Sequence, residues 1–269
     1  MATNFNVVPY YDDFSDDKNF HRILFRPGFA VQARELTQLQ TILQKQVERF
    51  GSHVFEEGSM VIPGDLNFDL EYDFIKIKAS YNSESVETYR ANLLDKIISN
   101  TNGLKARVIG STAATDTDPI TLYIKYENTA TSDNTTQVFA RNEVLTATNA
   151  NNTTTTNTNL TSNQTTEYTV QVQDTESAVG IGSAVRVHAG VYFVLGNFVA
   201  NTEQTILLDK YTNTPSYRIG FTITESFVTP EDDGSLTDNA RGSTNENAPG
   251  AHRYKILLTL AKKTLTSTD

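Results

Sequence analysis

The residues from Gln32 to Phe50 repeat apolar side chains at helical spacing, which constrains the fold more than any other feature of the chain. The apolar positions follow one another at steps of 3, 4, 4 and 3 residues, so they share one face of an α-helix. They are Leu36, Leu39, Leu43, Val47 and Phe50, and Ile42 widens the stripe. The opposite face holds Gln, Lys, Glu and Arg, which favour helix. The pattern therefore predicts one long amphipathic helix.

Glycine and proline predict where this helix begins and ends. Pro27 and Gly28 interrupt regular structure before it. Gly51 directly follows the last periodic residue, where a left-handed C-cap is favoured. We therefore expect the helix to end at Phe50.

The apolar stripe has two possible partners. Written as heptads, Leu36, Leu43 and Phe50 occupy a positions, and Leu39 and Gln46 occupy d positions. This arrangement can seat copies of the same helix in a bundle, and a single polar Gln in such a seam can set register and copy number. An ordinary amphipathic helix packed on a sheet of its own chain explains the same spacing. Fewer than three full heptads are present, so the spacing alone favours the second interpretation.

The rest of the chain reads as β structure. Short apolar runs, several with strict alternation, are separated by turn residues. Strands are expected over 59–63, 72–79, 86–89, 93–98, 104–109, 120–126, 138–145, 205–208, 217–223 and 254–260, with two or three more in 183–199. A long loop is expected over 229–250. The sequence thus predicts an α+β, mainly β fold, with an N-terminal arm and one long amphipathic helix followed by antiparallel β domains.

Charge and composition exclude several classes of protein. The 269 residues carry a net charge of −10, which disfavours a broad surface for nucleic acid or anionic membrane. There is no cysteine, so no disulfide or thiolate site can form. No apolar run reaches about 18 residues, so no membrane span is expected. The first residues lack the basic and apolar regions of a signal peptide, and we expect synthesis and assembly in the cytoplasm of a cell.

Residues 1–31 are rich in aromatic side chains but weakly periodic. Such a segment is typical of a strap that docks on another surface, in the same subunit, a sister subunit or a partner. The candidate contact residues in it are Tyr10, Tyr11, Phe14, Arg26 and Phe29. An acidic cluster at residues 12–17 is compatible with a cation site, but it lacks the Gly and distal Glu of a calcium loop, so a solvated turn is favoured.

Residues 147–166 form a low-complexity tract of Thr and Asn with one large apolar residue, Leu160. It cannot bury enough surface to offset the entropy of ordering its backbone. We expect a long exposed loop, and a Thr-rich edge strand is the alternative.

The chain shows no constellation of residues for catalysis, a metal or a cofactor. The four histidines (His21, His53, His188 and His252) form no HExxH motif, and a G-x-S-x-G elbow is missing. Paired acids such as Asp232 and Asp233 are adjacent in sequence, which does not indicate carboxylates facing each other across a cleft. We therefore expect no enzyme activity, no cofactor and no metal.

Two stretches resemble a known family. The first is FHRILFRPGFAVQARELTQLQTILQKQVERFG, from Phe20 to Gly51. The second lies between Gly190 and Leu260 and contains GVYFVLGNFV and NENAPGAHRYKILLTL. Together they are similar to the N-terminal part of tailed-phage virion proteins, found in cyanophages and other contractile-tailed phages and described as tail fibre or baseplate proteins with a domain of unknown function.

This resemblance implies a structural role in the virion: an attachment module that joins a fibre to the baseplate of a contractile tail. It implies a homotrimer whose partners are baseplate wedge or other tail proteins. Family members continue beyond the equivalent of Leu260 into further β domains, so host contact through this chain would be indirect. With a trimeric fibre base in view, self-association through the helix stripe becomes the favoured interpretation. Arg34 and Glu35, beside the stripe, are then candidates for pairing between copies.

The expected organisation has three parts. Residues 1–64 form the arm and helix, for attachment and oligomerisation. Residues 65–180 form a β insertion domain that contains the 147–166 tract, and residues 181–269 form an antiparallel β domain that completes the attachment module. The alternative function is a carbohydrate-binding β module that recognises host surface glycans, in which exposed Tyr81, Tyr89 and Tyr123 would stack on sugars.

Overall fold

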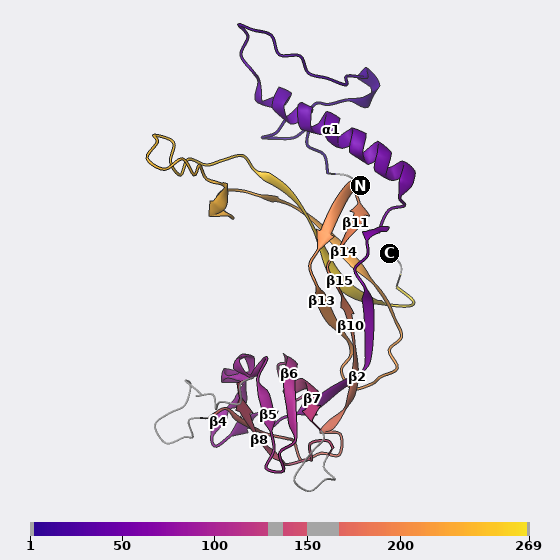
Figure 1. The fold of residues 1–269 in the computed structure, drawn as a ribbon, viewed down its shortest axis with the longest axis vertical. Helices are drawn as coiled ribbons and strands as arrows, with labels where there is room; N and C mark the ends of the chain where they lie inside the picture. Colours follow the sequence, from indigo (N-terminus) through magenta and orange to yellow (C-terminus); the bar gives the residue numbers. More distant parts are fainter. Residues whose placement is uncertain (1–2, 129–136, 150–166, 268–269) are drawn as a thin grey trace. The chain divides into compact units, whose positions relative to one another are not determined.

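The computed structural model of the chain describes residues 3–128, 137–149 and 167–267 (Figure 1). It is mainly β, with one α-helix and antiparallel sheets, as the sequence predicts. The helical elements are α1 (Ala33–Val54) and the short 3₁₀ helices η1 (Asp16–Lys18), η2 (Val86–Thr88), η3 (Arg90–Leu93) and η4 (Gly234–Leu236). The strands of the first half are β1 (Met60–Ile62), β2 (Leu66–Lys76), β3 (Ser80–Tyr81), β4 (Glu84–Ser85), β5 (Ile97–Ser99), β6 (Lys105–Thr112) and β7 (Thr121–Asn128). Those of the second half are β8 (Val144–Thr148), β9 (Thr169–Gln171), β10 (Val179–Val187), β11 (Gly190–Val194), β12 (Asn197–Asn201), β13 (Gln204–Asp209), β14 (Tyr217–Val228) and β15 (Arg253–Thr264).

The chain divides into two compact units, each built from separated segments. Unit 1 contains residues 1–67, 186–205 and 218–263. Unit 2 contains residues 68–185, 206–217 and 264–269. The predicted division keeps residues 1–64 and residues 181–269 in separate parts, whereas unit 1 combines most of both.

The largest sheet has eight strands in the order β13-β10-β2-β7-β6-β5-β8-β9, and unit 2 contains most of it. β7 is central in this sheet and buries side chains on both faces. Ile120, Leu122 and Ile124 enter a large core cluster on one face, with Tyr126 packed against it, as their alternation predicts. Tyr123 enters a second cluster on the other face, stacked on Tyr72 at 5.3 Å.

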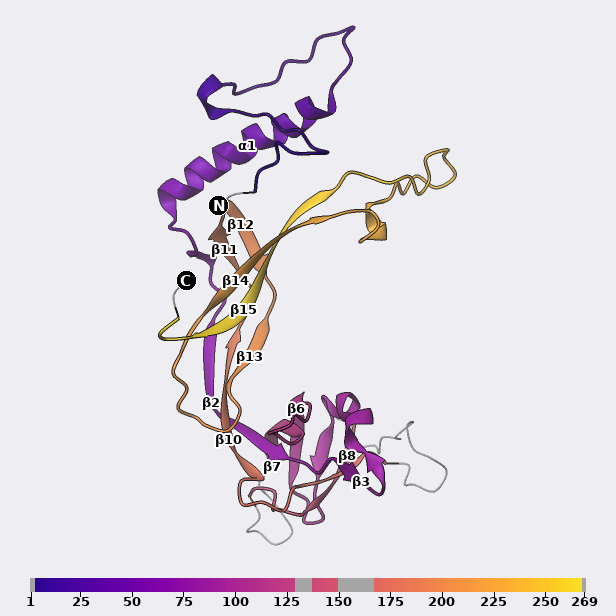
Figure 2. The ribbon, with the colours of Figure 1, turned by 180° about the vertical axis from the view of Figure 1, so that it is seen from behind.

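Unit 1 contains α1, a three-stranded sheet (β1-β11-β12) and the two-stranded ribbon β14–β15 (Figure 2). Side chains of the sheet, including Tyr192 and Val199, pack against Phe221, Ile256 and Leu258 of the ribbon. The β11–β12 hairpin turns at Leu195 and Gly196, which both have positive φ (50° and 73°), the backbone conformation that tight hairpins require.

The end of α1 differs from the prediction. Gly51 is not a C-cap but a buried residue inside the helix, and the helix continues to Val54. A Cβ added to Gly51 would lie 2.3 Å from the Phe193 ring, so the missing side chain is what lets the helix approach β11. The start agrees with the prediction, because Arg26 to Phe29 form a turn with Gly28 at φ 84° and the Glu35 carboxylate accepts a hydrogen bond from the Gln32 N–H at 2.9 Å.

Three expected strands are wrong in whole or in part. Residues 86–88 and 90–93 form 3₁₀ turns, and in the 138–145 run only Val144 and Leu145 enter a strand. These side chains are apolar because they fill the core between loops and sheet: Val86 and Leu93 are fully buried. In the Thr/Asn tract, Ala147 and Thr148 belong to β8 and Ala147 is buried, whereas 150–166 lie outside the described residues.

Candidate functional site

The apolar stripe of α1 is open to solvent in the single chain. We call this surface the apolar face; it consists of Leu36, Leu39, Leu43, Val47, Phe50 and Val54. Their exposed fractions are 51, 38, 62, 41, 66 and 54 % in that order. Of the residues of α1, only Ile42 and Gly51 are buried. The interpretation in which this stripe packs on a sheet of the same chain is therefore wrong.

Residues 3–31, which we call the N-terminal segment, cover the polar side of the helix and not the apolar face. The Asp13 carboxylate binds Arg34 at 3.3 Å and accepts a hydrogen bond from Gln38, and the Asp16 carboxylate binds Arg49 at 2.8 Å. At about 100° per residue, these helix positions lie about 150° round the axis from the apolar face. The acidic cluster is thus paired with the helix rather than simply solvated.

Asp12 makes the most protected of these contacts. It is only 6 % exposed, and its carboxylate accepts hydrogen bonds from the Thr41 hydroxyl and, at 3.2 Å, from the Phe14 N–H. Phe14 is half-buried and lines a shallow hollow together with Ile42. The one buried apolar side chain of α1 therefore faces the N-terminal segment.

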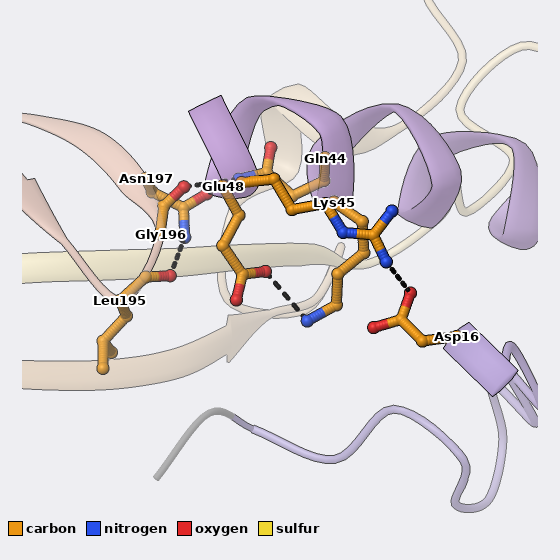
Figure 3. A network of polar contacts seen from close by, with 8 residues as sticks. Asp16, Gln44, Lys45, Glu48, Leu195, Gly196 and Asn197 are labelled. Atoms are coloured by element: carbon orange, nitrogen blue, oxygen red, sulfur yellow. Dashed lines mark hydrogen bonds and ion pairs between the residues drawn. The ribbon is translucent and has the colours of Figure 1, made fainter. Parts of the chain in front are cut away.

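The β11–β12 turn covers a third side of the helix (Figure 3). The Gln44 amide donates hydrogen bonds to the Gly196 carbonyl at 3.0 Å and to the Asn197 side chain at 2.8 Å. Lys45 and Glu48 form an ion pair along the helix at 2.8 Å. Two sides of α1 are therefore held by its own chain, and the side left open is the apolar one.

The other predicted contact residues lie in two different places. Tyr10 is half-buried on the β14–β15 ribbon, where its ring stacks on Phe227 at 5.2 Å and its hydroxyl lies 2.8 Å from His252 Nδ1. Arg26 lies over the Phe29 ring at 4.3 Å, and both are exposed in the loop before α1. Tyr11 is 56 % exposed.

The first residues are also tied to the ribbon. Phe5 packs edge-on against Tyr254 at 5.1 Å, and the Glu225 carboxylate accepts hydrogen bonds from the Thr3 hydroxyl and, at 2.5 Å, from the Tyr254 hydroxyl. These hydrogen bonds hold the pKa of Glu225 below its usual range. Burial, with the nearby Glu225 carboxylate, raises the pKa of Tyr254 to about 12.

The structure bears on two predicted residue roles. Arg34 pairs with Asp13 and Glu35 caps the helix within the chain, and their pairing between copies stays a prediction. Tyr89 and Tyr123 are 2 % and 1 % exposed and cannot stack on a sugar. Burial raises the pKa of both hydroxyls, that of Tyr123 to about 12.

Val54 is the member of the apolar face that sequence reasoning missed, because the helix was expected to end before it.

A polar cluster that the sequence did not single out lies beside β10. Glu203 binds Arg186 at 2.6 Å and His188 Nδ1 at 3.0 Å, and the hydrogen bond from Arg186 holds the pKa of Glu203 below its usual range. All three side chains are 38–50 % exposed, as in a surface ion-pair network.

Among the described residues, no group of three or more His, Asp or Glu side chains could hold a metal ion.

Comparison with known proteins gives one match. Residues 8–101 match the model of a family described as a domain of unknown function (DUF4815), which covers about a third of the chain. The matched region includes most of the N-terminal segment, all of α1 and β1 to β5. No curated protein and no solved structure matches the chain significantly. In the part that the structure describes, no helix is long and apolar enough to cross a membrane.

Proposed function

We propose that this protein is a structural component of a tailed-phage virion, an attachment module that joins a fibre to the baseplate of the contractile tail. It acts as a homotrimer, without catalysis, and is assembled in the host cytoplasm before it enters the virion. The observation that carries the proposal is the apolar face of α1. It is open to solvent, while the polar side of the same helix is covered by the chain itself. Contiguous exposed apolar side chains are typical of protein–protein interaction sites, which supports the proposal.

The size of the apolar face decides what it can contribute. Fully burying one large apolar side chain stabilises by about 1.5–3 kcal/mol, so six that are about half exposed offer roughly 5–9 kcal/mol per copy. Association costs about 4–15 kcal/mol in lost freedom of motion. The apolar face can thus drive assembly when each copy contributes its own, and it favours a closed oligomer in which every face is covered.

The division into units supports the finer form of the proposal. The two stretches that resemble tailed-phage virion proteins, 20–51 and 190–260, are far apart in sequence, yet unit 1 contains the first entirely and most of the second. An N-terminal arm, a helix and a β module would then act together in attachment. Unit 2 would be the inserted β domain, and baseplate wedge or other tail proteins would be the partners.

Immunogold electron microscopy of virions from the phage that encodes this chain tests the proposal. Antibodies against the purified protein are expected to label the baseplate end of the tail, with no label on capsids. Peptides of the chain are expected in the mass spectrum of purified particles. A protein found in infected cells but absent from purified virions would contradict the proposal. A mutant phage that loses the chain yet retains complete tails and fibres would contradict it as well.

A further inference from the structure

The loop that precedes α1 is a second apolar surface that its own chain leaves open. We call residues 20–31 the apolar loop; its exposed large apolar side chains are Phe20, Leu24, Phe25, Phe29 and Val31. Their exposed fractions are 64, 75, 48, 64 and 54 % in that order. Figures 1 and 2 show the segment leaving η1 and returning to the N-terminal end of α1. Apart from the turn at Arg26–Phe29, it has no regular structure.

We propose that the apolar loop of one copy packs on the apolar face of α1 in a neighbouring copy. This inference rests on the proposed homo-oligomer and names which segment of the second copy covers the helix. Both surfaces are exposed in the single chain, so neither covers the other within it. Exchange between copies would bury both at once.

The anchoring of the loop explains why it does not cover its own helix. Its first end is held by the Asp16–Arg49 ion pair on the covered side of α1, at 2.8 Å. Its second end continues directly into the helix through Gln32, whose N–H is bound by Glu35. Both ends are therefore fixed away from the apolar face, which leaves the loop free to reach another molecule.

The apolar face is too small to form a stable interface without a second surface. From Leu36 to Val54 the apolar face is about 27 Å long and about 10 Å wide, a footprint of roughly 270 Å². A stable interface takes about 800 Å² from each partner. Contact between helices alone falls short of that, and a contact that includes five more large side chains from the loop comes closer.

Charge favours an acidic partner, and a second copy of this chain is one. Residues 18–34 contain Lys18, Arg22, Arg26 and Arg34 and no acidic residue, a charge of +4. The whole chain carries −10, so the remainder carries −10 − 4 = −14. A basic segment is attracted to an acidic chain, and a second copy provides one; α1 from Glu35 onward is charge-balanced, so the apolar side chains give the contact its position.

Site-directed cross-linking tests the inference directly, because the natural chain has no cysteine. One variant carries Leu24→Cys in the loop and another carries Leu43→Cys on the apolar face; the two are mixed, allowed to assemble and oxidised. A fast disulfide between the two different chains requires that the loop of one lies close to the helix of the other, whereas random collision gives only slow cross-linking. The control replaces Leu43→Cys by Ser52→Cys, which is exposed on the opposite side of α1. A second loop position, Phe29→Cys, repeats the test.

The expected result is a mixed disulfide with Leu43→Cys that forms roughly 100-fold faster than with Ser52→Cys, because the loop holds the Leu24→Cys thiol against the apolar face at millimolar effective concentration and leaves it remote from the opposite side of the helix. Assembly with disulfides only between two Leu43→Cys chains would overturn the loop exchange and leave the proposed oligomer intact. Equal rates for both partners would overturn the loop exchange too. A natural chain that stays monomeric under the same conditions would overturn both.

Discussion

α1 and β7 carry the two strongest apolar patterns in the chain, and their apolar side chains end in opposite surroundings. Leu122 and Ile124 of β7 are 0 % and 1 % exposed, whereas Leu43 and Phe50 of α1 are 62 % and 66 % exposed. The same physical chemistry, apolar side chains at the period of their secondary structure, specifies both elements. The comparison teaches that periodicity predicts the element and its face, but not which molecule covers that face.

The largest expected effect contrasts one leucine from each element. Leu122→Ala leaves a cavity in a closed core and lowers the free energy of unfolding by about 2–5 kcal/mol. Leu43→Ala, the same chemical change at an open position, changes it by about 0.5 kcal/mol or less when the protein is dilute enough to be monomeric. Urea unfolding followed by circular dichroism measures both. Equal losses at the two positions would show that the apolar face is covered by its own chain.

The contact between α1 and β11 gives the next effect. Gly51→Ala places a methyl group against the buried Phe193 ring, and overpacking of this kind costs about 1–3 kcal/mol. Ser52→Ala is the matched control, because Ser52 is exposed, and we expect a change within about 0.5 kcal/mol. If Gly51→Ala raised the stability of the protein, the helix would not be pressed against β11 as described.

The covered side of the helix can be opened at Asp12. Asp12→Ala removes the acceptor for the Thr41 hydroxyl and the Phe14 N–H, which costs about 1–2 kcal/mol. Hydrogen exchange is expected to rise in residues 12–16 and along the polar side of α1. Asp17→Ala, at an exposed position in the same cluster, is the control and is expected to leave exchange unchanged. Identical exchange in the two variants would contradict the assignment of the N-terminal segment to this side.

The smallest effect is a pH dependence at Glu225. Its folded pKa lies below the ordinary value of 4.5, so the stabilisation that it provides is fully present above pH 4.5 and is lost as the pH falls through the folded pKa. The N-terminus should therefore loosen from the ribbon only in acid. An NMR titration of the Glu225 carboxyl is expected to show a depressed pKa that moves toward 4.5 in Tyr254→Phe. A pKa of 4.5 or above in the natural protein would contradict the contact.

The sequence predicted the elements better than their packing. Alternation located β7 and the apolar side chains on one of its faces, and helical spacing located α1 and its stripe. It missed the end of α1 because a glycine after a helix commonly acts as a cap, whereas Gly51 is selected by close contact with Phe193, about 140 residues away. It assigned strand to Val86 and Leu93 because buried apolar residues look alike in a strand and in a 3₁₀ turn.

The candidate site was predictable only as a list of residues. Leu36, Leu39, Leu43, Val47 and Phe50 share one face because a helix places them there. That this face is open follows from contacts between distant segments, such as Asp16 with Arg49 and Gln44 with Asn197, which no local pattern contains. The grouping of Tyr10 with Phe227 and His252 on the ribbon depends on long-range packing in the same way.

The central claim is that the apolar face of α1 is an assembly surface, and light scattering after size exclusion tests it most directly. The natural chain is expected at a mass near three times 29.8 kDa. Leu39→Asp with Leu43→Asp is expected to fall to a single chain while it keeps its fold by circular dichroism, and Ser52→Asp, on the opposite side of the helix, is expected to keep the assembled mass. A natural chain that is monomeric at micromolar concentration, or an assembly that survives both aspartates, would contradict the claim.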